Sequence, residues 1–126
     1  MSKPLNIGAF AAVQYLPHIE TFLATGDGDF DGPIWAKATS EIKFVDGRAS
    51  FTMVHEFMSR DGSRISTVDT ATGIQVPGID EVSLTVMHKV VDSTGKFEGL
   101  RGTFPSFGLH NFATGKGVQR FGGELS

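Results

Sequence analysis

Hydrophobic and polar residues alternate along two segments of the chain, 48–59 and 81–91, as they do in strands that bury one face. Each apolar row contains a single histidine, His55 in the first segment and His88 in the second. An imidazole among hydrocarbon side chains is either a core residue with a satisfied hydrogen bond or a group that exchanges protons with a small molecule. The two rows comprise Phe51, Met53, His55 and Phe57, and Val82, Leu84, Val86, His88 and Val90.

Turn sequences divide the rest of the chain into short runs at regular intervals. Pairs such as Asp46-Gly47 and Thr114-Gly115 are typical of hairpins that connect consecutive antiparallel strands. A closed sheet removes the exposed edges that such a meander would otherwise leave. We therefore predict an all-β chain, with residues 1–126 forming a single antiparallel eight-stranded barrel. The predicted strands are 28–36, 40–46, 48–59, 63–72, 81–91, 97–104, 107–113 and 117–125.

The first 27 residues break this rhythm. Residues 9–16 fit a strand or a helix, and Pro17 is a possible start for a short helix that ends at Gly26. We expect residues 1–27 to form a short leader that covers or plugs one end of the barrel.

The hairpin at residues 60–62 decides which polar groups share the interior. A three-residue loop pairs Met53 with Asp69 and Phe57 with Ile65, so Asp69 points inward. A two-residue Asp-Gly turn would shift the pairing by one residue and point Asp69 outward. We prefer the first register because it matches apolar with apolar residues.

This register predicts a lumen that contains His55, Asp69, His88 and Arg101. Arg101 faces inward only if the row of residues 97–104 that contains Phe97 is the buried one, and glycines in both rows leave that open. A histidine would act as general acid or base, Asp69 would fix its tautomer or take the proton itself, and Arg101 would hold an anionic oxygen. His18 and His110 are expected to be structural or exposed. Substrate contacts are predicted from Tyr15, Trp35, Phe51, Met53, Phe57, Leu84, Val86 and Phe97.

Composition and charge narrow the function classes. The net charge is −3 and the 11 Lys and Arg residues are scattered singly, which argues against a nucleic-acid partner. The chain has no cysteine, so we expect a cytoplasmic protein without disulfides, and its start is too short and polar for a signal or a membrane span. His55 and Glu56 lie on opposite faces of one strand and no His-x-His spacing exists, so a metal site would need lone histidines from separate strands to converge. No phosphate-binding or dinucleotide motif is present, and we predict neither a metal nor a cofactor.

The C-terminal third resembles a known family. Residues 90–104 contain the sequence Thr-Gly-Lys-Phe-Glu-Gly-Leu-Arg-Gly, and residues 113–117 follow after a hairpin. Together they are similar to the Thr-Gly-x-Phe-x-x-x-x-Gly strand pair of the allene oxide cyclase and dirigent-like barrels. The resemblance implies an eight-stranded barrel, often a dimer or trimer, whose lumen shapes a hydrophobic substrate without a cofactor. It implies no catalytic residues, because the matched motif is a structural turn.

These patterns predict a cofactor-independent enzyme that binds a small apolar or aromatic molecule in the lumen and carries out acid/base isomerisation, cyclisation or lyase-type elimination. The alternative is a non-catalytic carrier of a lipophilic small molecule. A purely structural module would instead have a filled interior. The outer row Thr52, Val54 and Met58 is partly apolar, so we also predict a homodimer or homotrimer.

Overall fold

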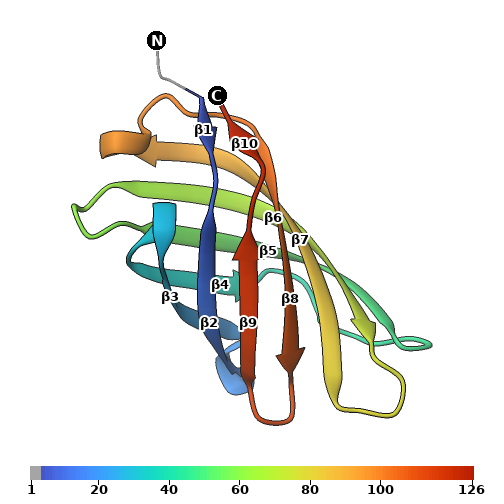
Figure 1. Cartoon of the computed structure of the whole chain (residues 1–126). Helices are drawn as coiled ribbons and strands as arrows, with labels where there is room; N and C mark the ends of the chain where they lie inside the picture. Colours follow the sequence, from blue (N-terminus) through green and yellow to red (C-terminus); the bar gives the residue numbers. More distant parts are fainter. Residues whose placement is uncertain (1–3) are drawn as a thin grey trace.

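The computed structural model describes residues 4–126, whose strands close into one antiparallel barrel (Figure 1). Each strand pairs with the next, and the last pairs with the first, so the barrel has no open edge. This confirms the predicted all-β, eight-stranded barrel. Its strands are β2 (Ala9–Leu16), β3 (Thr21–Gly26), β4 (Pro33–Ala38), β5 (Arg48–Met58), β6 (Arg64–Gln75), β7 (Glu81–Thr94), β8 (Thr103–Asn111) and β9 (Lys116–Phe121).

The N-terminal residues depart from the expected plug. β2 and β3 are two of the barrel strands, joined by the 3₁₀ helix η1 (Pro17–Ile19). Only the short β1 (Leu5–Asn6) leaves the barrel, where it pairs with β10 (Glu124–Leu125) at the end that holds both termini (Figure 1). Among the described residues, no helix is long and apolar enough to cross a membrane.

Two of the predicted strands are not formed. Residues 40–46 are irregular apart from a single bridge at Val45. Residues 97–102 lie in η3 (Gly95–Phe97) and an irregular segment, because Gly95, Gly99 and Gly102 all adopt positive φ values that a strand does not contain, and residues 103–104 begin β8. A third 3₁₀ helix, η2 (Gly28–Phe30), occupies the start of the predicted strand 28–36.

The hairpin between β5 and β6 has the preferred register. Met53 pairs with Asp69 and Phe57 with Ile65, and Gly62 takes the left-handed conformation at the turn. The inward rows of β5, β6 and β7 are therefore those that alternation predicted.

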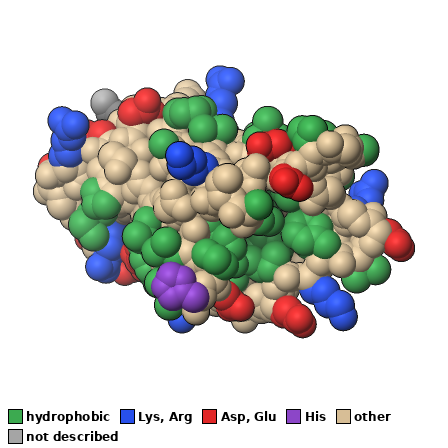
Figure 2. Space-filling model, turned by 90° about the horizontal axis from the view of Figure 1, so that it is seen from below, with side chains coloured by type: hydrophobic (Ala, Val, Ile, Leu, Met, Phe, Trp, Pro, Cys, Tyr) green, Lys and Arg blue, Asp and Glu red, His purple; other side chains and the backbone are tan. Residues whose placement is uncertain are grey.

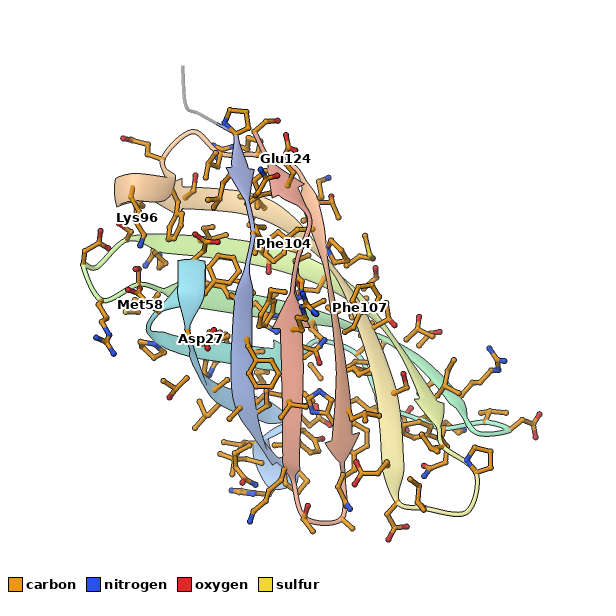
Figure 3. All side chains as sticks on the ribbon, in the orientation of Figure 1. Asp27, Met58, Lys96, Phe104, Phe107 and Glu124 are labelled. Atoms are coloured by element: carbon orange, nitrogen blue, oxygen red, sulfur yellow. The ribbon has the colours of Figure 1, made fainter. Side chains whose placement is uncertain are left out.

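The barrel interior differs between its two ends. Near β1 and β10 it is filled by aromatic rings, which Figure 3 shows crowded around Phe104. Toward the other end several inward positions of β4, β5 and β6 are small, at Ala36, Ala49 and Ala71, among larger ones such as Phe51 and Met53. Small side chains do not fill a barrel of this size, so free space is left in this half. The aromatic half contains Phe30, Phe57, Phe97, Phe104 and Phe121.

Candidate active site

Three inward side chains from neighbouring strands meet at the middle of the barrel. Asp69 of β6 lies directly opposite His88 of β7, and His55 of β5 lies two residues from the position that pairs with Asp69. One carboxylate oxygen, Oδ2, is 2.6 Å from His55 Nδ1. The other, Oδ1, is 2.9 Å from His88 Nδ1 and accepts a hydrogen bond from Thr67 Oγ1 at 2.6 Å. The predicted grouping of the two histidines with Asp69 is thus present in the structure.

The charge of this cluster is on Asp69. Burial raises the pKa of the carboxyl, but the hydrogen bonds from His55 and His88 outweigh burial and hold it below its usual value of 3.8. Burial lowers the pKa of His88 to about 4, against the opposing effect of its bond to Asp69. At neutral pH the site therefore contains an ionised Asp69 and a neutral His88, whose Nδ1–H donates to the carboxylate.

A chain of hydrogen bonds continues from His88 to the far strands. His88 Nε2 is 2.7 Å from Ser106 Oγ, and Gln119 Nε2 donates to the same hydroxyl at 2.8 Å. Gln119 Oε1 is 2.8 Å from His110 Nε2. Four polar side chains on β7, β8 and β9 are thereby oriented relative to one carboxylate, Asp69.

A cavity lies between this network and the small-residue half of the barrel. His55, His110 and Gln119 line it, together with apolar side chains. His55 Nδ1 is bonded to Asp69, which leaves Nε2 without a partner within residues 4–126. His88 is fully buried and uses both ring nitrogens, so it positions Asp69 and does not line the cavity. The apolar lining residues are Val13, Phe22, Ala24, Ile34, Ala36, Met53, Leu84, Val86 and Phe121.

The cavity is small, with a volume of about 30 Å³. This is room for about one or two water molecules, so a larger ligand requires lining side chains to move. Met53 is suited to such movement because its unbranched chain adapts its shape at low cost.

Aromatic side chains cover the end of the barrel beyond the cavity. Tyr15 stacks on Phe22 with ring centroids 4.4 Å apart and also contacts Phe112. Phe44, from the irregular segment between β4 and β5, lies 6.0 Å from Phe112. Figure 2 views the barrel from below and shows hydrophobic side chains gathered near the centre of this end. Apolar side chains therefore flank the cavity at this end, and His55, which is 8% exposed, lies in largely apolar surroundings.

Several predicted site residues lie elsewhere. Arg101 is exposed and bonds Ser93 Oγ and the Leu100 carbonyl, so its prediction as a lumen residue is wrong. Trp35 is 39% exposed on the outer face of β4 and does not line the site. The segment around Arg101 is not a strand, and β4 buries the row that alternates with Trp35.

The predicted substrate contacts divide along the barrel. Met53, Leu84 and Val86 line the cavity as predicted. Phe57 and Phe97 instead belong to the aromatic half. Phe51 and Tyr15 lie with the cluster around the small residues, where Tyr15 covers the barrel end.

Ser106, His110 and Gln119 were not predicted to belong to the site. His110 was expected to be structural or exposed, and the structure buries it at the cavity wall. The sequence signal is the inward row of β8 and β9, in which polar residues alternate with Gly108 and Gly117.

The cluster of His55, Asp69 and His88 also has the composition of a metal site. One ligand atom from each lies within 4.8 Å of the others. A metal ion there would have to replace the two imidazole protons that are bonded to the carboxylate, and it would then be bound by two histidines and one carboxylate.

Comparison with protein-family models, with curated proteins and with solved structures finds no match for this chain. The resemblance to the allene oxide cyclase and dirigent-like barrels therefore stays a prediction.

Proposed function

We propose that this protein is a cofactor-independent enzyme in which His55 acts as a general base on a small ligand bound in the barrel lumen. The observation that carries the proposal is the 2.6 Å bond between Asp69 Oδ2 and His55 Nδ1. With Nδ1 donating to the carboxylate, a neutral His55 ring has its lone pair on Nε2, as in other carboxylate–histidine pairs that act as bases.

The reaction class follows from what this pair can do. His55 Nε2 accepts a proton from the ligand, and the carboxylate of Asp69 stabilises the imidazolium that forms. The same nitrogen then returns the proton to another atom of the ligand. Such a cycle produces isomerisation, cyclisation or elimination with no change in oxidation state and no added reactant. A positioned general base contributes a factor of about 10² to 10⁴ in rate.

A non-catalytic carrier is the second candidate, and the largely apolar lining of the cavity favours it. A carrier requires a cavity of suitable shape that excludes water, but it gains nothing from an imidazole oriented by a buried carboxylate. Replacement of His55 therefore separates the two functions.

The matched variant is His55→Asn. The asparagine amide nitrogen takes the place of imidazole Nδ1 and preserves the donor to Asp69, while the base at Nε2 is removed. Wild type and His55→Asn are incubated with a pool of small metabolites, which is then compared by untargeted mass spectrometry at several times. We expect features that convert to products of equal mass, or of mass reduced by a small eliminated molecule, with wild type only.

Equal conversion by wild type and His55→Asn would contradict the role of His55. Ligands that bind both proteins and are released unchanged by both would identify a carrier.

The chain also has a partly apolar outer face that fits self-association. Val54 of β5 pairs directly with Val68 of β6, and Met87 of β7 lies close by, with Val68 and Met87 44% and 41% exposed. We define these three residues as the outer patch. Covering it in a homodimer or homotrimer would remove this apolar surface from water.

A further inference from the structure

The wall of the cavity that faces away from Asp69 carries a buried polar atom without a partner. His110 is 2% exposed, and its Nδ1 makes no hydrogen bond with any described residue. Its other nitrogen is bonded to Gln119, and the ring lines the same cavity as His55. Leaving a buried polar atom unpaired costs free energy, so this nitrogen, which has almost no accessible surface, is a candidate contact for a ligand that displaces the lining side chains.

The direction of each hydrogen bond in the network fixes what this nitrogen can do. Ionised Asp69 can only accept, so His88 donates to it from Nδ1 and must accept at Nε2. Ser106 then donates its hydroxyl proton to His88 and accepts from the Gln119 amide nitrogen.

The orientation of the Gln119 side-chain amide sets the donor and the acceptor of the next hydrogen bond, at the far wall of the cavity. Because Gln119 Nε2 points at Ser106, its carbonyl oxygen faces His110 Nε2, which must hold the proton. Burial lowers the pKa of His110, so the ring is neutral and its Nδ1 carries a lone pair. His110 Nδ1 is thus a hydrogen-bond acceptor, as His55 Nε2 is.

We infer that the lumen binds a small uncharged molecule that donates two hydrogen bonds, one to His55 Nε2 and one to His110 Nδ1. A compact diol or another polyhydroxylated molecule has this chemistry. The inference rests on the proposed function and narrows its substrate class. It also gives His55 Nε2 a hydroxyl proton to accept in the proposed proton transfer.

Anions are excluded by the same geometry. Among the described residues the lining contains no Lys or Arg, and Arg101, which was expected to hold an anionic oxygen, lies outside the barrel. The nearest charge is the carboxylate of Asp69, which is bonded to His55. An anion in this cavity would lose its hydration without gaining a cation.

Two glycines show that this wall of the cavity is shaped around its polar side chains. A Cβ at Gly117 would lie 2.1 Å from His110 Nδ1, and a Cβ at Gly108 would lie 2.1 Å from Gln119 Oε1. Across the β8–β9 pair, His110 is opposite Gly117 and Gln119 is opposite Gly108. Each polar side chain therefore occupies the space that a glycine leaves.

The test compares three probes of four heavy atoms: ethylene glycol with two donors, acetone with no donor, and acetate with a negative charge. Long-range ¹⁵N spectra of the histidine side chains report the tautomer of each ring and the effect of each probe. We expect His110 with its proton on Nε2, and we expect ethylene glycol to shift His110 Nδ1 and His55 Nε2 together. Acetone and acetate should produce no saturable shift.

The variant is His110→Gln, which keeps a donor at the position of Nε2 for Gln119 and removes the acceptor at Nδ1. Loss of one hydrogen bond should weaken ethylene glycol binding about fivefold. Should this variant not fold, the probe series on wild type decides the matter. A proton on His110 Nδ1, or binding of acetate or acetone as strong as that of ethylene glycol, would overturn the inference.

These readouts need no turnover. Binding of ethylene glycol to both histidines with no conversion in the metabolite experiment would refute the proposed enzyme and leave the ligand class standing. Conversion of an anionic metabolite by the wild type would support the proposed enzyme and refute the ligand class.

Discussion

Lowering the pH from 7 to 5 is expected to destabilise the barrel by about 2 kcal/mol through His88 alone. The unfolded chain binds a proton at this residue near pH 6.5, but burial lowers its pKa to about 4 in the folded protein. Between these two values the unfolded state holds more protons, so the free energy of unfolding falls as the pH falls. The loss is about 2 kcal/mol by pH 5 and about 3 kcal/mol by pH 4, at 1.36 kcal/mol per pKa unit.

The other buried groups also affect how the free energy of unfolding depends on pH. Asp69 has a lowered pKa, so the stability it contributes is constant between pH 7 and 5 and is lost only below about pH 4. His110 has a lowered pKa and adds a loss of the same sign as His88.

The assay is urea denaturation followed by circular dichroism at pH 7, 6 and 5. The variant His88→Asn keeps a donor to Asp69 at the position of Nδ1 but cannot titrate, so its loss between pH 7 and 5 should be smaller than that of wild type by about 2 kcal/mol. His18→Asn is the control, because His18 is exposed and outside the network. If wild type and His88→Asn lose the same free energy of unfolding between pH 7 and 5, the role assigned to His88 is refuted.

Three further predictions concern the network and the assembly. Asp69→Asn should lower the free energy of unfolding at pH 7 by about 3 kcal/mol, because two buried imidazole donors lose a charged acceptor; an unchanged urea midpoint would show that the carboxylate is not ionised. Gly117→Ala should cost about 1–3 kcal/mol, since the added Cβ would lie 2.1 Å from His110, whereas Gly122→Ala, with nothing within 4 Å, should be neutral; equal melting temperatures for the two variants would contradict the close packing. Sedimentation velocity at micromolar concentration should show a dimer or trimer that a charge placed in the outer patch dissociates, and a wild-type monomer would remove that proposal.

The central part of the fold and of the site could be predicted because local signals agreed there. Strict alternation placed His55 and His88 on inward rows, and the Asp-Gly turn with matched apolar pairs placed Asp69 beside them. In this region each strand is long and the hairpin leaves one register that buries the apolar row.

The position of Arg101 could not be predicted from alternation. Alternation assumes a strand, but glycines with positive φ at 95, 99 and 102 turn this segment into a 3₁₀ helix and an irregular stretch. Phe97 and Leu100 are both buried there although they lie on opposite rows of a strand. Odd and even positions lie on opposite faces only where the backbone is extended, and here it is not.

His110 and Gln119 were missed for a different reason. Their role depends on a contact between β8 and β9, where each faces a glycine, and on hydrogen bonds to β7. A lone histidine on a strand gives no sign of such partners. The register of the β7–β8 pair, which alternation alone does not give, brings Ser106 against His88.

The most direct test of the central claim is the ratio of kcat/KM between wild type and His55→Asn for a metabolite that the wild type converts. If His55 Nε2 is the base, the ratio should be about 10² to 10⁴, with circular dichroism spectra and urea midpoints showing that the variant is folded. A folded His55→Asn protein with kcat/KM within about twofold of the wild-type value would contradict the account, and proton transfer by His55 would have to be abandoned.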